Sequence, residues 1–236
     1  MTARAVRNSW ITAGVILFMG LGGAVGEDAP PEDSLRAHAK DGFYISALTS
    51  HHTIGRGFDG KTFLHDRKEI LLVPDIDADQ GFGLVLGFRD GAEALEFSYW
   101  RSKHDATLRD EHDTPLPGAD FDALFQAVTM DLRRYFFTAD PVQPSVLLGI
   151  TFPWVKVTDA SVNAAGQVGD ASFYGLGVNI GVGLSYYVHQ RVSARGDITY
   201  RLIGYWTASG VEGERKSIDT ISGSGFDYSL GLQFTF

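Results

Sequence analysis

Histidines beside acidic residues are the side chains of this chain best suited to metal or proton chemistry. His51 and His52 are adjacent, and an aspartate follows each of His65, His104 and His112. Imidazole with carboxylate is a donor set that suits zinc or copper. No spacing matches a recognised metal motif, however, so solvated histidines of exposed loops are the favoured interpretation. We therefore expect no metal site and no cofactor.

Nucleophilic catalysis would need a serine, a histidine and an acid brought together. The nearest histidine–serine spacing, His189 to Ser193, begins in a predicted turn, so we expect no catalytic residues. The glycines of 175–183 fall at every second residue and lack the strand–loop–helix setting of a nucleotide-binding loop. They are better explained as small residues that leave room for bulky neighbours.

Charges within otherwise alternating segments are the second chemically capable set. Four basic and four acidic residues share a face with small polar residues: Arg89, Glu96, Asp131, Arg133, Arg195, Asp197, Arg201 and Asp227. If that face is enclosed, each charge must be paired or cost several kcal/mol. We expect a balanced ion-pair network, which either fills the enclosed space or lines a polar path for small solutes.

The segments that carry these charges alternate with period two, the signature of β-strands. In 226–236 every even position is apolar or aromatic and every odd position is small or polar. The stretch 174–188 alternates over its whole length, far beyond the usual five or six residues of a soluble strand. Eight strands are predicted, near 43–50, 81–89, 92–102, 122–136, 145–157, 172–188, 192–205 and 224–236.

Connection lengths alternate between short and long, as expected of a transmembrane β-barrel. Asp90-Gly91, 137–144 and 189–191 are short, whereas the connections listed next are long: 51–80, 103–121, 158–171 and 206–223. The apolar piece 70–73 either extends the second strand or belongs to a hidden hairpin that would raise the count to ten. Arg134 falls on the apolar face, which is tolerable near a headgroup region.

Two architectures fit the alternation: a soluble sandwich with the apolar face inward, or a membrane barrel with that face toward lipid. Strands of 11 to 15 residues suit a tilted span. Aromatic residues gather near strand ends, and the chain stops on Phe236 in phase with the apolar face. Since hydrocarbon offers no partner for backbone groups, only a closed ring of strands can cross it. We expect an all-β, closed antiparallel eight-stranded transmembrane barrel.

The N-terminal region has the three parts of a cleaved signal peptide: Arg4 and Arg7, an apolar run, and small residues before Glu27. We expect a signal peptide at 1–26, a flexible acidic lead-in at 27–42 and one barrel domain at 43–236. The absence of cysteine excludes disulfide scaffolds and thiolate chemistry, and a net charge of −9 argues against nucleic-acid binding.

The signal peptide, the eight alternating strands and the ending Gln233-Phe234-Thr235-Phe236 resemble the small outer-membrane β-barrel family of the OmpA-like and opacity-protein kind. The resemblance covers about 43–236. It implies a Gram-negative outer membrane, contact with outer-membrane lipid and lipopolysaccharide, and Phe234 and Phe236 as the C-terminal signal read by the barrel-assembly machinery. It does not transfer a function.

The preferred hypothesis is a monomeric barrel with a structural or surface-interaction role and a lumen plugged by ion pairs. A narrow channel for small solutes is the alternative. A lipid A-modifying enzyme is the third hypothesis. The predicted long loops are acidic, which suits either solvation or binding of cationic partners.

Overall fold

The computed structural model describes residues 39–236 except 56, 61, 66–68 and 111. The predicted signal peptide and most of the lead-in therefore lie outside the described residues. Within the described part, regular structure consists of twelve β-strands, and no helix there is long and apolar enough to cross a bilayer.

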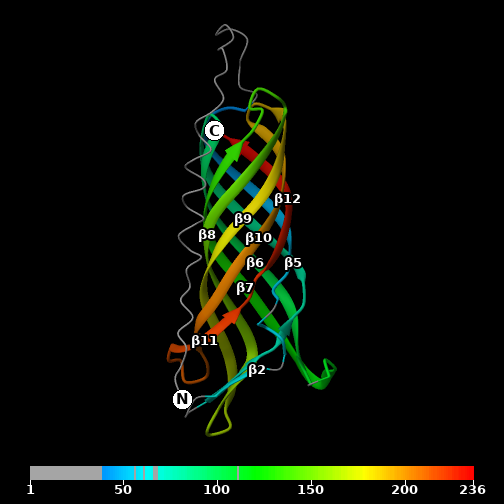
Figure 1. The fold of residues 1–236 in the computed structure, drawn as a ribbon, viewed down its shortest axis with the longest axis vertical. Helices are drawn as coiled ribbons and strands as arrows, with labels where there is room; N and C mark the ends of the chain where they lie inside the picture. Colours follow the sequence, from blue (N-terminus) through cyan, green and yellow to red (C-terminus); the bar gives the residue numbers. More distant parts are fainter. Residues whose placement is uncertain (1–38, 56, 61, 66–68, 111) are drawn as a thin grey trace, which may run out of the picture. The chain divides into compact units, whose positions relative to one another are not determined.

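Eight of these strands close a ring by antiparallel pairing between neighbours, and β1 pairs with β12 to complete it (Figure 1). Their order around the ring follows the chain: β1 (Gly42–His52), β5 (Asp79–Asp90), β6 (Glu93–Arg109), β7 (Pro115–Tyr135), β8 (Val142–Asn163), β9 (Val168–His189), β10 (Val192–Ser209) and β12 (Gly225–Thr235). The closing register runs from Tyr44 opposite Thr235 to His52 opposite Asp227. No ring strand is left with a free edge, as the hydrocarbon environment requires.

Side chains on the ring strands alternate between exposed and buried, and the exposed set is the apolar one. On β12, Leu230 and Leu232 are 63% and 65% exposed, whereas Ser229, directly before Leu230, is only 7% exposed. A soluble sandwich would show the reverse arrangement. The prediction of a closed transmembrane barrel is confirmed.

The short connections join β5 to β6, β7 to β8 and β9 to β10, and they share one end of the barrel with the C-terminus (Figure 1). At the first of these turns Gly91 has φ of +59°, a conformation that favours glycine. Of the predicted lead-in, Lys40 and Asp41 bond to this end: the Lys40 amide donates to Gln190 and the Gly91 amide donates to the Asp41 carboxylate.

All four predicted long connections contain strand residues. Most of 103–121 and 158–171 is strand, because β6–β7 and β8–β9 continue as paired hairpins beyond the apolar belt to turns at 110–114 and 164–167. The sequence in these extensions carries polar side chains outside and therefore lacks the apolar alternation from which strands were predicted.

The ring has eight strands and not ten, so the ten-strand alternative is wrong for the ring. The hairpin predicted in the first connection is present. The first connection contains β2 (Thr62–His65), β3 (Glu69–Val73) and β4 (Asp75–Ile76); β2 pairs with β3, β3 with the outer part of β8, and β4 with β6. A further short strand, β11 (Lys216–Ser222), pairs with β10. Figure 1 shows β2 and β11 at the end opposite the C-terminus.

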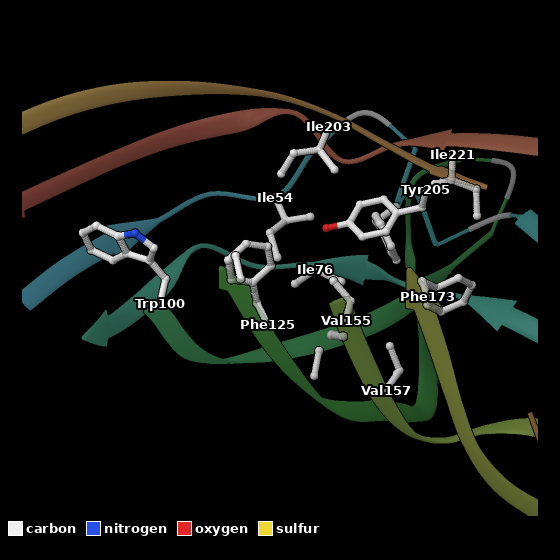
Figure 2. Close-up of a cluster of buried hydrophobic side chains, with 14 of the residues drawn as sticks. Ile54, Ile76, Trp100, Phe125, Val155, Val157, Phe173, Ile203, Tyr205 and Ile221 are labelled. Atoms are coloured by element: carbon white, nitrogen blue, oxygen red, sulfur yellow. The ribbon is translucent and has the colours of Figure 1, made fainter. Parts of the chain in front are cut away.

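An apolar core fills the barrel interior at this loop end. Figure 2 shows side chains of the first connection, Ile54 and Ile76, pointing toward side chains of the inner wall. Phe58 joins them and contacts the rings of Phe173 and Tyr205 edge-on, with centroids 5.4 and 5.3 Å apart. The first connection therefore contributes side chains to the apolar core inside the barrel.

Candidate functional site

All eight predicted lumen charges lie on the inner wall and are buried, each with at most 7% of its surface exposed. They come from five strands, because inward positions recur at every second residue on β5, β6, β7, β10 and β12. The structure does not bring the eight into one network. It forms two ion-pair groups and leaves two charges with neutral partners.

The central group joins Glu96, Arg133, Arg195 and Asp197. Arg195 donates from both terminal nitrogens to Glu96, at 2.8 and 2.9 Å, and from Nε to Asp197 at 2.7 Å. Arg133 donates from Nε to Glu96 at 3.0 Å and from Nη1 to Asp197 at 2.8 Å. Each arginine therefore bridges both carboxylates, and the four charges sum to zero.

Neutral side chains complete the hydrogen bonding of the central group. The Tyr44 hydroxyl donates to Glu96, and Arg133 also donates to the Ser145 hydroxyl at 2.7 Å. The glycine face of β9 gives the arginine its space: a Cβ at Gly183 would overlap Asp197 and come within 2.5 Å of Arg133 Nη1. This explains why small residues alternate along the inner face of β9.

The second group lies nearer the loop end and joins Arg201, Asp227 and His52. Arg201 lies 3.1 Å from Asp227, and His52 Nδ1 lies 3.2 Å from the same carboxylate oxygen. The Arg201 guanidinium also lies over the Trp100 ring, 5.1 Å from its centroid, a favourable cation–π arrangement. The group thus connects the polar interior to the apolar core beyond it.

Arg89 and Asp131 form no ion pair with another described residue. Arg89 donates to the Tyr187 hydroxyl and to the Gly91 carbonyl, both at 2.8 Å, and lies 4.1 Å from the Tyr135 ring centroid. Asp131 accepts from Thr129 at 2.6 Å and from Asn179 at 2.9 Å.

Sequence reasoning missed two inner-wall histidines by assigning them to loops. His52 and His104 are each 2% exposed, and their rings contact with centroids 5.9 Å apart. Both share the parity of inward serines, Ser50 on β1 and Ser102 on β6, so continuing the alternation past the predicted strand ends would have found them. His112, in contrast, is exposed.

Ser102 and His104 form a hydrogen-bonded pair that resembles a nucleophile with its base. The Ser102 hydroxyl lies 2.7 Å from His104 Nε2, and His104 Nδ1 lies 2.7 Å from the Asp77 carbonyl oxygen. A carbonyl partner fixes the proton on Nδ1, so Nε2 accepts from the serine. Both side chains are buried in the lumen. Among the described residues, no group of three or more histidine, aspartate or glutamate side chains is arranged to hold a metal ion.

The charged groups line a small cavity. A cavity of about 20 Å³ lies between the central group and Arg201, lined in part by Trp100, Asn179 and Ser229. That volume is roughly what a single water molecule occupies. Polar groups thus line the middle of the barrel, and the apolar core lies toward the loop end.

The predicted assembly signal lies on the outside of the barrel. Phe234 and Phe236 are exposed, their rings meet edge-on with centroids 5.4 Å apart, and the Phe236 amide donates to the Phe43 carbonyl at 2.9 Å. The final residues therefore lie at the seam between β12 and β1.

No protein-family model and no curated protein matches the chain. Solved structures do match it. The outer membrane protein OprG from Pseudomonas aeruginosa is 17% identical, with a TM-score of 0.54 over 86% of this chain and 99% of that one. Neisserial surface protein A (NspA) is 18% identical, with a TM-score of 0.50 over 82% of this chain and 97% of that one. The closed eight-strand ring, its outward apolar belt and these matches show that the chain has the fold of the small outer-membrane β-barrels.

Proposed function

We propose that this protein is a closed outer-membrane barrel whose role is structural or surface-interactive, with a lumen that conducts no solutes. The observation that carries the proposal is the packing of the interior. Paired charges line a cavity of about 20 Å³ in the middle of the barrel, and an apolar core lies at the loop end. A solute would have to break several buried ion pairs and displace the first connection.

The same packing supports a non-enzymatic role. The buried pair that most resembles catalytic chemistry, Ser102 and His104, lies between the core residues Trp100 and Ala106 on the inner face of β6 and away from the lipid-facing surface. A substrate acyl chain held in the membrane would meet the outer wall instead. We propose no catalytic residue, cofactor or metal.

The proposed location is the outer membrane of a Gram-negative bacterium after export by a cleaved signal peptide. The fold and the apolar belt support it, and the exposed aromatic end at Phe234 and Phe236 suits recognition by a barrel-assembly machinery. Lipid and lipopolysaccharide would be the surrounding partners. We propose a monomer, since ring closure pairs both edges of every ring strand and leaves none free to pair with another chain. We propose no nucleic-acid partner.

Conductance in planar bilayers tests the closed lumen. The purified full chain should insert and give no steady, resolvable channels. Steady unitary conductance would support the alternative, a narrow channel for small solutes. A gel-mobility shift on heating shows that the sample is a folded barrel, and deacylation or acyl-transfer assays on labelled lipopolysaccharide test the enzyme hypothesis.

A further inference from the structure

The apolar belt on β6, β7 and β8 ends at a hydrogen-bonded row of three outward side chains. The Gln126 side-chain amide donates from Nε2 to the Tyr99 hydroxyl at 2.5 Å, and the Trp154 indole donates to Oε1 of the same amide at 2.9 Å. Tyrosine and tryptophan place their rings in hydrocarbon and their polar atoms among headgroups. This row therefore marks the headgroup level on this face of the barrel, toward the loop end.

Basic side chains occupy the next outward positions beyond the row. Arg101 follows Tyr99 on β6, and Lys156 follows Trp154 on β8. Lys103 is the next outward residue on β6, and the register places Lys103 and Lys156 on either side of Leu124. Two strand spacings separate them, roughly 10 Å. Arg215, from the connection before β11, lies over the ring of Tyr174, whose strand partner is Trp154.

We call these four residues the basic patch: Arg101, Lys103, Lys156 and Arg215. All four are exposed. Arg101 and Lys103 form no ion pair with any described residue, whereas Lys156 pairs with Asp170 at 2.6 Å.

Two other cations of the outer wall have acidic partners. At the opposite rim Arg134 lies 3.4 Å from Glu93, and at the loop end Arg109 lies 2.6 Å from Asp75. Arg101 and Lys103, in contrast, are neighbouring cations without an acidic partner in the described part of a chain whose net charge is −9. Their position at the headgroup level indicates that the matching negative charge comes from the membrane.

We propose that the basic patch binds the phosphate groups of an anionic outer-leaflet glycolipid, with Arg101 and Lys103 as the main contacts. This proposal rests on the proposed membrane location. Outward positions of one strand two residues apart are about 7 Å from each other, so two cations can contact one phosphate-bearing headgroup. The arginine fork suits bidentate phosphate contact, and lysine adds a point charge.

The layers on either side of the basic patch favour a lipid over a soluble anion. Toward the short turns the wall is apolar at Phe97 and Val128, which acyl chains can contact. Beyond the patch Asp105 and Asp122 are directly opposite each other on β6 and β7 and point outward. These carboxylates would repel a phosphate, so they set the outer boundary of the site and fix the orientation of the lipid.

Native mass spectrometry of the full chain in detergent tests the proposal, with diphosphoryl lipid A and its dephosphorylated form as probes. Arg101→Gln with Lys103→Gln should weaken binding of the phosphorylated probe about 30-fold, since each basic residue near an anionic surface contributes about fivefold. Lys103→Gln alone should weaken it about fivefold. Neither should change binding of the dephosphorylated probe.

The matched control removes two positive charges at the opposite rim, the half-buried Arg134 and the exposed Arg191, by Arg134→Gln with Arg191→Gln. It has the same net charge as the test variant and should bind the phosphorylated probe within about twofold of the unmodified chain, because screening limits distant charges. Equal losses in both double variants, or no loss in the test variant, would overturn the proposal. Heat-shifted gel mobility verifies that each variant is folded.

The outcome is independent of the closed-lumen proposal. A barrel that conducts and still loses phosphate binding in the test variant keeps the lipid site and refutes the closed lumen. A barrel that does not conduct and does not discriminate between the probes keeps the closed lumen and refutes the lipid site.

Discussion

Glu96→Gln is the most informative change to the lumen because one carboxylate holds two arginines. Glu96 lies 2.8 Å from Arg195 and 3.0 Å from Arg133, and its side chain is 3% exposed. The amide keeps the shape of the side chain and removes its charge. The central group then carries two arginines against Asp197 alone.

The expected cost follows from leaving a buried positive charge without its partner. Breaking a buried pair by removing one member typically destabilises a protein by about 3–5 kcal/mol. Glu93 provides the control on the same strand. It faces outward, its side chain is 73% exposed, and it pairs with Arg134 at 3.4 Å. Glu93→Gln should cost about 0–1 kcal/mol, the value for surface pairs.

Equilibrium urea unfolding in lipid vesicles, followed by tryptophan fluorescence and by heat-shifted mobility, measures both changes. Combining Glu96→Gln with Arg195→Gln restores neutrality, since Arg133 and Asp197 remain paired at 2.8 Å. The double variant should therefore be less destabilised than the sum of the single variants by about 0.5–3 kcal/mol. Equal stabilities of the Glu96 and Glu93 variants, or strict additivity, would refute a buried, mutually dependent group.

Three further changes have definite expected outcomes. Gly231→Ala should lower the folded fraction, since a Cβ there would overlap the Ala47 carbonyl at the closing seam. Gly196→Ala is the control, because its Cβ would meet no atom nearer than 3.6 Å and the variant should fold normally. The refolding yields of the two variants are compared. Phe58→Ala should cost about 3–5 kcal/mol in urea unfolding. It should still give no bilayer conductance, because the proposed closure by the charged groups does not involve Phe58. Deleting Phe236 should leave refolding in detergent intact and reduce outer-membrane assembly in cells, measured by surface labelling; equal assembly would count against the terminal signal.

Period-two alternation was sufficient to predict the ring. The stretch 174–188 lies within β9, and the ladder between β1 and β12 joins the first and last predicted strands. Alternation predicts these strands because one face of a membrane strand contacts lipid along its length and the other faces the lumen. Parity also placed all eight charges on the inner wall, as their burial shows.

The partners of those charges could not be predicted from parity. Arg195 reaches Glu96 across the barrel, 99 residues away in the chain, and nothing local distinguishes it from Arg201, which pairs with Asp227 instead. Pairing depends on height along the axis and on strand tilt. Neither quantity is encoded in the alternation of a single strand.

The apolar core at the loop end was missed for a related reason. Val155 and Val157 alternate with the outward residues Trp154 and Lys156 along β8. The two valines face inward, where polar residues were expected from the sequence. Beyond the membrane the outer face meets water and the inner face packs against Ile54 and Phe58. The polarity of the strand therefore inverts along its length, which a single assignment of faces cannot represent.

The central claim is that the apolar face of each strand contacts lipid and the polar face is enclosed. Because the chain has no cysteine, single cysteines introduced at successive positions 226–235 of β12 can carry a spin label. In lipid vesicles, relaxation by oxygen should be high at even positions such as Leu230 and low at odd positions such as Ser229, repeating every second residue. Even positions that respond instead to a water-soluble nickel chelate, with no preference for oxygen, would contradict the account.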